Sequence, residues 1–121
     1  KQPILLIGGP TDKDKEEAIL KIKTINSVIG TTTIHQSTAL MAKCSKVICN
    51  DSGPMHMASA VNDNVIALFG PTDPKRLGPL NKNSKVIWKQ KAPSYNNRGK
   101  YSGKSNELNK IKVVDVLREL K

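Results

Sequence analysis

The amino-acid sequence predicts an α/β domain whose parallel sheet is flanked by helices. Short apolar runs alternate along the 121 residues with segments that carry helix-start signals, a rhythm typical of parallel strands joined by helical crossovers. The apolar runs end at glycine, proline or polar residues, where the chain can turn. A chain of this length fits one domain. Ligands of such folds bind at the carboxyl ends of the strands, so the residues directly after each strand are the functional candidates.

The first strand is expected at Ile4–Ile7, a continuous apolar run that would be buried on both faces and that ends at the Gly8-Gly9-Pro10 turn. Thr11 is expected to cap the following helix, whose early turns are acidic and whose later part carries lysines, as the helix dipole favours. The apolar residues of this helix would face the sheet: Ile19, Ile22 and Ile25.

The remaining elements follow in the same alternation. A strand near Ser27–Ile29 leads through Gly30 to a helix capped by Thr32 or Thr33. Later segments are expected in this order: helix Ile34–Lys43, strand Lys46–Cys49, helix Pro54–Val61, strand Val65–Phe69, loop Thr72–Asn83, strand Lys85–Trp88 and a polar loop Ala92–Asn106. The end of the chain, Glu107–Lys121, is expected to be one docking helix with an apolar stripe of Leu108, Ile111, Val114, Leu117 and Leu120.

The formal net charge of +10 is concentrated in one segment, Lys75–Lys104, which holds nine basic residues and no acidic one. Such a segment suits a phosphate-rich partner, namely an anionic membrane face, a phosphorylated glycolipid or a nucleic acid. It could equally be a solvated surface. The nearby aromatic residues, Trp88, Tyr95 and Tyr101, are few for a single-stranded nucleic-acid groove, and no nucleic-acid partner is expected.

No apolar run approaches the length of a membrane span, so a soluble protein is expected. Cys44 and Cys49 do not have the spacing of a zinc knuckle or of a disulfide scaffold, which favours reduced thiols and a cytoplasmic location. A zinc site that combined them with His35 and His56 would lack any compact ligand pair. His35 is expected on the surface.

Asn50–Ala58 is the segment with the most candidate functional residues, and it lies where a predicted strand ends and a predicted helix begins. Gly53 allows close approach of a ligand, and Pro54 suits the first helical turn. The free amides there and the positive end of the helix dipole would bind a diphosphate without a metal. Asp51 would repel phosphate and is better suited to sugar hydroxyls. The alternative is an ordinary helix cap by Asp51 or Ser52.

Asp12 and Asp14 match the DxD pattern of metal-dependent glycosyltransferases, in which carboxylates hold a divalent ion. Both acids lie in the first turn of the expected helix, where the helix dipole explains them without a metal. No metal site and no cofactor are therefore expected.

The run Asp51-Ser52-Gly53-Pro54-Met55-His56, followed by Val65–Phe69 and by Gly70-Pro71-Thr72-Asp73-Pro74, resembles the C-terminal domain of glycosyltransferase family nine, the bacterial heptosyltransferases of lipopolysaccharide core assembly. The resemblance covers about Ile4–Pro79. The domain in that family begins one strand and one helix earlier, so the resemblance implies that residues 1–121 are a partial C-terminal nucleotide-sugar-binding domain without the N-terminal acceptor domain.

The resemblance implies a GT-B enzyme, in which two Rossmann-like domains face each other across a cleft. It would transfer heptose from ADP-heptose to a lipid A-linked core at an anionic membrane face, with inversion and without a metal, and it would be cytoplasmic or peripheral at the inner membrane. The resemblance assigns Asp51 to the donor sugar, Ser52 and Gly53 to the diphosphate, and His56 to the donor or its loop. Thr32 and Thr33 would lie against the nucleoside, and Gly9 would line the donor site. The general base is expected on the other domain, so the isolated chain should bind donor without catalysing transfer.

Two alternatives stay open at the level of sequence. One is a GT-B transferase or epimerase for another nucleotide sugar, which a preference for UDP over ADP would indicate. The other is a basic nucleic-acid or membrane-surface module, which would bind through Lys75–Lys104 with a steep dependence on salt.

Overall fold

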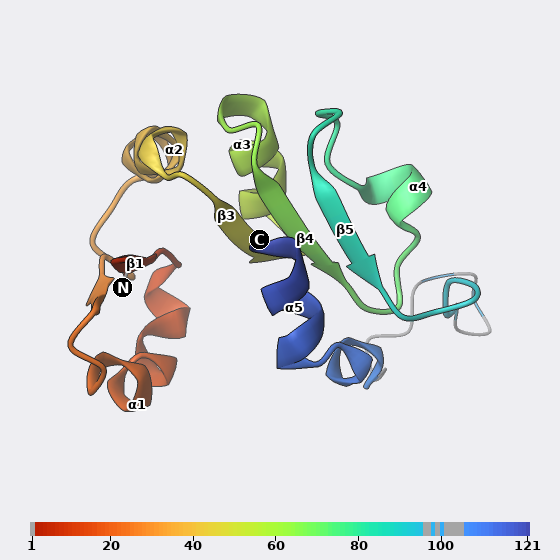
Figure 1. The fold of residues 1–121 in the computed structure, drawn as a ribbon, viewed down its shortest axis with the longest axis horizontal. Helices are drawn as coiled ribbons and strands as arrows, with labels where there is room; N and C mark the ends of the chain where they lie inside the picture. The colour runs from red at the N-terminus through yellow and green to blue at the C-terminus, as the bar shows by residue number, and fades with distance from the viewer. Residues whose placement is uncertain (1, 96–97, 99, 101–105) are drawn as a thin grey trace. The chain divides into compact units, whose positions relative to one another are not determined.

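The computed structural model describes residues 2–95, 98, 100 and 106–121 (Figure 1). The chain divides into two compact units, Lys1–Leu40 and Met41–Lys121. Each unit contains a parallel sheet with helices beside it, which confirms the expected α/β class.

The first unit pairs two short strands in parallel, β1 (Ile4–Leu6) and β2 (Ile25–Ser27). Strand β1 is not buried on both faces as predicted, since Ile4 is half exposed and Leu5 and Leu6 are only partly buried. The second strand begins two residues earlier than expected. Gly30 has a φ of +69°, and a Cβ there would come within 3.1 Å of the Pro10 backbone, so this turn requires glycine.

The predicted helix after Gly9 is wrong in its form. The chain makes a 3₁₀ helix, η1 (Pro10–Lys15), and one short turn, α1 (Glu17–Leu20). The amide of Gly9, rather than Thr11, begins η1 by donating to Asp12 Oδ2 at 3.2 Å. Farther along, Glu16 accepts a hydrogen bond from the Ser27 hydroxyl. Ile19 and Ile22 are exposed instead of facing a sheet.

Helix α2 (Ile34–Lys43) has the predicted bounds and the predicted cap. Thr33 Oγ1 accepts from the Gln36 amide at 3.2 Å, and Gln36 Oε1 accepts from the Thr33 amide at 2.9 Å. This reciprocal pair is a capping box that satisfies two backbone donors at the helix start.

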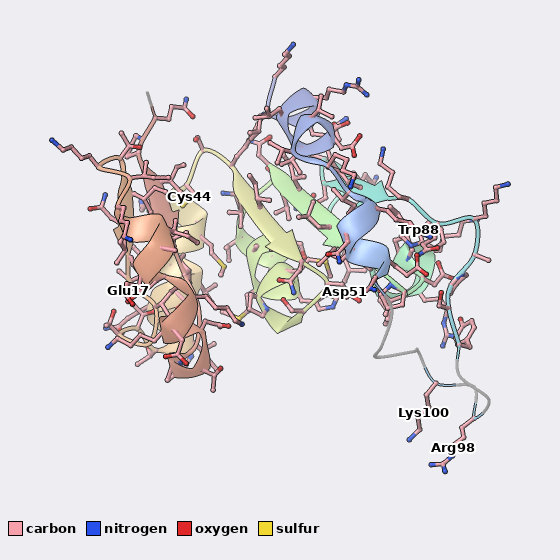
Figure 2. The ribbon with its side chains drawn as sticks, turned by 90° about the horizontal axis from the view of Figure 1, so that it is seen from below. Glu17, Cys44, Asp51, Trp88, Arg98 and Lys100 are labelled. Atoms are coloured by element: carbon pink, nitrogen blue, oxygen red, sulfur yellow. The ribbon has the colours of Figure 1, made fainter. Side chains whose placement is uncertain are left out.

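The second unit is built on a three-stranded parallel sheet in the order β3 (Val47–Asn50), β4 (Val65–Phe69) and β5 (Lys85–Trp88). Helix α3 (Gly53–Val61) and helix α5 (Val113–Glu119) lie on opposite faces of this sheet (Figures 1 and 2). Strand β4 lies between two neighbours and carries more of the buried hydrophobic residues than any other described element, as its unbroken apolar run predicts.

The core lies between the sheet and α3. Met55 from α3 packs with Ala67 and Phe69 from β4, and all three are fully buried. Burial of a side chain as large as Phe69 is worth about 2–3 kcal/mol. Three partly buried residues close the edge of this cluster: Cys49, Leu77 and Trp88.

Asn62 is a buried polar hub at the end of α3. Its Nδ2 donates to the backbone oxygens of Met41 at 2.8 Å and of Cys44 at 2.7 Å, and its Oδ1 accepts from the Asn64 amide at 2.8 Å. The side chain therefore satisfies carbonyls in the last turn of α2 and fixes the entry into β4.

The predicted loop Thr72–Asn83 contains one helical turn, α4 (Pro74–Leu77). Asp73 Oδ1 caps it by accepting from the Lys75 amide at 2.9 Å, a signal that the sequence carried and that the prediction missed. The predicted polar loop Ala92–Asn106 lies largely outside the described residues.

The C-terminal segment is not the single helix that was predicted. It forms η2 (Glu107–Lys110) and then α5, with a break at Lys112, whose extended backbone begins α5 while its amide donates to Asp115 Oδ2 at 2.8 Å. The break shifts the helical register, so most of the predicted stripe is exposed: Leu108, Val114, Leu117 and Leu120. An ion pair of 2.7 Å between Asp115 and Lys89 links α5 to the end of β5 instead.

Candidate functional site

The carboxyl ends of β3 and β4 bring the two sequence blocks singled out above into contact. Asp51 follows β3, and its amide donates to the Leu68 oxygen of β4 at 3.1 Å. Its carboxylate accepts a hydrogen bond from Thr72, which follows β4, with 2.5 Å between Oγ1 and Oδ2. Figure 2 shows Asp51 at this end of the sheet. The Asp51 side chain is half-buried and held in place, and its Oδ1 accepts no hydrogen bond from the residues that the structure describes.

Ser52 and Gly53 form the start of α3, directly beside Asp51. Ser52 has extended backbone, and its hydroxyl donates to the Asn50 oxygen at 3.2 Å rather than capping the helix. Since neither Asp51 nor Ser52 caps α3 through its side chain, the simple helix-cap interpretation does not account for them. Pro54 has no amide proton and the Met55 amide donates to the Ser52 oxygen at 3.0 Å, so among the described amides of this turn the Gly53 amide keeps the capacity to bind an anion.

Gly53 is exposed, and a Cβ built on it would meet no atom of the described residues within 4 Å. Pro54 follows Gly53 in the first turn and has no amide proton, so the Gly53 amide is the donor that this part of the turn offers. The space in front of the glycine is open, and a ligand oxygen could approach the backbone there.

His56 is exposed on α3 and makes no side-chain hydrogen bond to any residue that the structure describes. The structure therefore gives no support to a bracing role for His56 in the Asp51 loop. Its backbone oxygen accepts from the Ser59 hydroxyl at 3.1 Å, which is a local helix contact.

The other predicted site residues belong to the first unit. Gly9 is exposed and begins η1. Thr32 shares a hydrogen bond of 2.8 Å with Ser37, and Thr33 caps α2. These hydroxyls shape the start of α2, and the structure describes them only within their own unit.

Sequence reasoning missed three contacts that hold the loop after β4. Trp88 Nε1 donates to the Gly70 oxygen at 3.0 Å, and the Ser94 amide donates to the Pro71 oxygen at 2.8 Å. Thr72 is the third, through its bond to Asp51. The sequence carried a signal for the proximity of these residues but not for the individual bonds, because neighbouring parallel strands place the residues that follow them side by side.

The structure also shows where the other candidate metal ligands of the sequence analysis lie. Asp12 accepts from Lys15 Nζ at 2.9 Å and from the Gly9 amide, and these contacts, Lys15 first, lower the pKa of its carboxyl. His35 is exposed on α2, as predicted. Across the described ranges, no three His, Cys, Asp or Glu residues gather as a metal-binding group.

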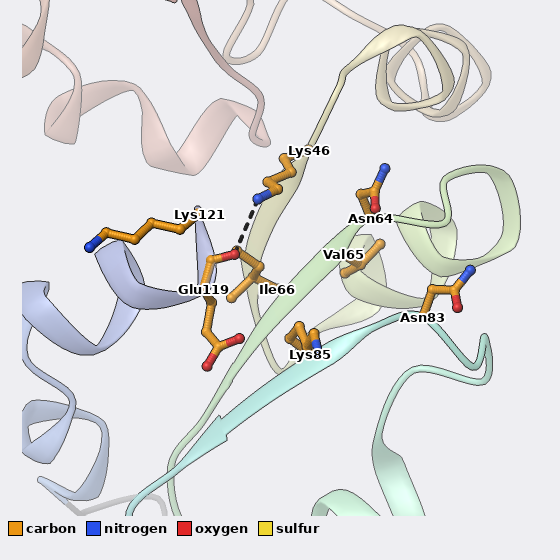
Figure 3. Close-up of a pocket in the computed structure, with 8 residues that line it drawn as sticks. All are labelled: Lys46, Asn64, Val65, Ile66, Asn83, Lys85, Glu119 and Lys121. Carbon is orange, nitrogen blue, oxygen red and sulfur yellow. Dashed lines mark hydrogen bonds between the residues drawn. The ribbon is translucent and has the colours of Figure 1, made fainter.

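A pocket of about 190 Å³ lies at the opposite, amino end of the strands (Figure 3). Lys46 stands before β3 at its rim and donates to the backbone oxygens of Glu119 at 3.2 Å and of Leu120 at 2.7 Å. A lysine at the last carbonyls of a helix is explained by the helix dipole. Lys46 therefore stabilises the C-terminal end of α5. The pocket is separate from Asp51.

The basic segment is partly used inside the fold. Lys89 pairs with Asp115, and the half-buried Trp88 is bonded through its ring nitrogen rather than offered for stacking. Lys104 and Tyr101 lie outside the described residues. Among the helices that the structure describes, none has the length and apolar character needed to cross a bilayer.

Comparison with known proteins gives a consistent result. The model of glycosyltransferase family 9 (heptosyltransferase) matches residues 1–106. Lipooligosaccharide heptosyltransferase 2 of Haemophilus influenzae is 43% identical over 61 residues, which are 50% of this chain and 18% of that protein. Lipopolysaccharide heptosyltransferase 2 of Escherichia coli K12 is 32% identical over 90 residues, which are 69% of this chain and 26% of that protein.

The fold agrees with a solved relative as well. The structure of the Escherichia coli ADP-heptose lipopolysaccharide heptosyltransferase II superposes with a TM-score of 0.80 at 29% identity, over 98% of this chain and 35% of that chain. The matched part of this chain therefore spans between 18% and 35% of the length of these relatives.

Proposed function

The chain belongs to glycosyltransferase family 9, the heptosyltransferases, and from that premise we propose that it is the donor-binding part of an enzyme that transfers heptose from ADP-heptose to the inner core of lipopolysaccharide. The relatives described above are named for heptosyl transfer, and the solved Escherichia coli protein is named for ADP-heptose. In this proposal residues 1–121 are part of the C-terminal domain of a two-domain GT-B enzyme.

The observation that carries the proposal is the open start of α3 beside a fixed carboxylate. Ser52 leaves the first turn without a side-chain cap, and Gly53 has free space in front of it. A diphosphate at this position would receive a backbone hydrogen bond from the Gly53 amide and would lie at the positive end of the dipole of a nine-residue helix. The binding of the diphosphate is therefore assigned to Ser52 and Gly53.

Asp51 suits the sugar end of the donor better than the phosphate end. Its carboxylate would repel the diphosphate, whereas it accepts hydrogen bonds from hydroxyl groups. One oxygen is already bonded to Thr72, so the other is the oxygen proposed to accept from a hydroxyl of the heptose. Thr32 and Thr33 are proposed to contact the nucleoside of the donor. Gly9 is proposed to line the donor site, and His56 is proposed to contact bound donor.

We propose that transfer inverts the anomeric centre and needs no metal, because the helix start supplies the positive charge that a divalent ion supplies elsewhere. No residue of this chain is proposed as the general base. The stereochemistry is tested by the anomeric configuration of the product by nuclear magnetic resonance, and the metal independence by activity of the complete enzyme in a chelator.

The site is tested by calorimetric titration of the protein with ADP-heptose, ADP and UDP in the presence of a chelator. We expect ADP-heptose to bind best and UDP worst. Asp51→Ala should weaken ADP-heptose at least tenfold, equal to about 1.4 kcal/mol, through the lost sugar contact. The same variant should not weaken ADP, and the loss of a carboxylate that repels the diphosphate should leave the affinity for ADP equal or slightly higher.

Asp63→Ala is the matched control, since Asp63 is exposed and precedes β4 at the other end of the sheet. It should bind all three ligands as the unmodified protein does. A requirement for a divalent metal, or equal effects of the two substitutions, would contradict the proposed site. Preference for UDP would point to a transferase or epimerase for another nucleotide sugar.

We also propose that the basic segment brings the enzyme to the anionic membrane face that carries its acceptor. Lys75, Arg76 and Lys82 are exposed in the described part of the segment, and each basic residue near an acidic bilayer contributes about 1 kcal/mol. Replacing the three by glutamine should reduce binding to vesicles with 30% anionic lipid at low salt. Equal binding to neutral vesicles would contradict this partner.

A further inference from the structure

We propose that Thr72 is a positioning residue that orients the Asp51 carboxylate toward the donor sugar. This role deepens the proposed function and rests on it, because it requires Asp51 to contact the sugar. The two residues are 21 positions apart in sequence and meet because β3 and β4 are parallel neighbours that end together.

The contact fixes the direction of the carboxylate. Thr72 Oγ1 donates its one proton to Asp51 Oδ2 at 2.5 Å. The backbone of Asp51 is held independently, since its amide donates to the Leu68 oxygen. With backbone and one oxygen both fixed, the direction of the second oxygen is fixed too, and it is available to a hydroxyl donor.

Thr72 can direct Asp51 because its own loop is anchored on both sides. Before it, the oxygens of Gly70 and Pro71 accept from the Trp88 indole at 3.0 Å and from the Ser94 amide at 2.8 Å. After it, Asp73 is occupied in capping α4. Trp88 of β5 therefore holds the loop, the loop holds Thr72, and Thr72 holds the Asp51 carboxylate.

Preorganisation gives this arrangement its functional value. A free aspartate would lose side-chain freedom when it met the sugar, and a loss of that size corresponds to about a three- to tenfold change in affinity. Thr72 has already restricted the side chain in the unliganded protein. The benefit appears only with ligands that Asp51 touches, which separates positioning from a general effect on the fold.

A double-mutant cycle tests the role. ADP-heptose and ADP are titrated calorimetrically into the unmodified protein, Thr72→Val, Asp51→Ala and the double variant, with a thermal melt of each. Thr72→Val keeps the shape and removes the hydroxyl, and Thr72→Ala replaces it in the cycle if the valine variant does not fold. Thr72→Ser is the rescue variant. Thr38→Val is the matched control, since Thr38 also donates one hydrogen bond, to the Ile34 oxygen of α2 at 2.8 Å.

We expect Thr72→Val to weaken ADP-heptose three- to tenfold and to leave ADP unchanged, with Thr72→Ser close to the unmodified protein. In the Asp51→Ala background, Thr72→Val should cause no further loss. Equal weakening of both ligands, or a loss that persists without Asp51, would refute positioning. If Asp51→Ala weakens ADP-heptose and Thr72→Val does not, the donor site stands and the role of Thr72 is refuted. If Asp51→Ala leaves ADP-heptose binding intact, the proposed function fails, and the positioning role fails with it.

Discussion

Replacing Asn62 by alanine is expected to destabilise the unit Met41–Lys121 strongly. The Asn62 side chain makes three hydrogen bonds at 2.7–2.8 Å, two to carbonyls at the end of α2 and one from the Asn64 amide. At a net value of about 1 kcal/mol for each, their loss costs about 3 kcal/mol. Asn62 is buried, so water cannot readily replace the missing donors.

The assay is urea unfolding followed by fluorescence of Trp88, the one tryptophan of the chain, which is half-buried in the same unit. The midpoint should fall while the slope stays constant, which identifies a loss of stability rather than a change in the unfolded state. Asn62→Asp should be at least as damaging, because a carboxylate cannot donate to the two carbonyls.

Asn83→Ala serves as the matched control, since Asn83 is exposed. It should change the free energy of unfolding by less than about 0.5 kcal/mol. A loss below about 1 kcal/mol for Asn62→Ala, or a loss equal to that of the control, would refute the account of Asn62 as a hub.

Two further predictions concern a thiol and a turn. Burial raises the pKa of the Cys49 thiol from 9.0 to about 11, so the thiolate fraction at pH 8 falls about 100-fold. Iodoacetamide should therefore label Cys49 slowly until the protein is unfolded, which peptide mass spectrometry would show. Fast labelling of the folded protein would contradict this. Gly30→Ala should lower the free energy of unfolding by about 1–2 kcal/mol in thermal or urea unfolding, because alanine is strained at positive φ. Gly9→Ala should be nearly neutral, since a Cβ there meets no described atom within 4 Å. Equal effects of the two substitutions would contradict this account of the turn.

The elements that the sequence predicted best carry their own boundary signals. Strand β4 is an unbroken apolar run between Asn64 and Gly70, and its bounds agree with the prediction. Helix α2 also agrees, because Thr33 and Gln36 stand at the spacing of a capping box. Local chemistry at the ends of an element is therefore enough to place it when that chemistry is unambiguous.

The failures come from contacts that a linear pattern does not contain. The helix expected after Gly9 is interrupted, and Glu16 bonds to Ser27, eleven residues away. The expected final helix breaks where Asp115 accepts from the Lys112 amide and also pairs with Lys89. The hydrogen-bond partner of the Glu16 side chain is the distant Ser27, and Asp115 has one partner on its own segment and one beside β5.

The position of the candidate site could be predicted from the sequence, but the hydrogen bonds within it could not. Parallel strands place Asp51 at the carboxyl edge, and Gly53 and Pro54 identify the helix start. The bond from Thr72 to Asp51 depends on how far the loop after β4 turns back, which Trp88 fixes from a third strand. No spacing along the chain specifies that turn.

Gly53→Ala, studied by ADP binding together with thermal unfolding, tests the central claim most directly. The added methyl group meets no described atom within 4 Å and stands at the start of a helix, so the melting temperature should be unchanged or slightly higher. If a diphosphate approaches the backbone here, the same methyl group should weaken ADP at least tenfold. Lost affinity with unchanged stability is the predicted result, and unchanged affinity for ADP would contradict the placement of the donor diphosphate at the start of α3.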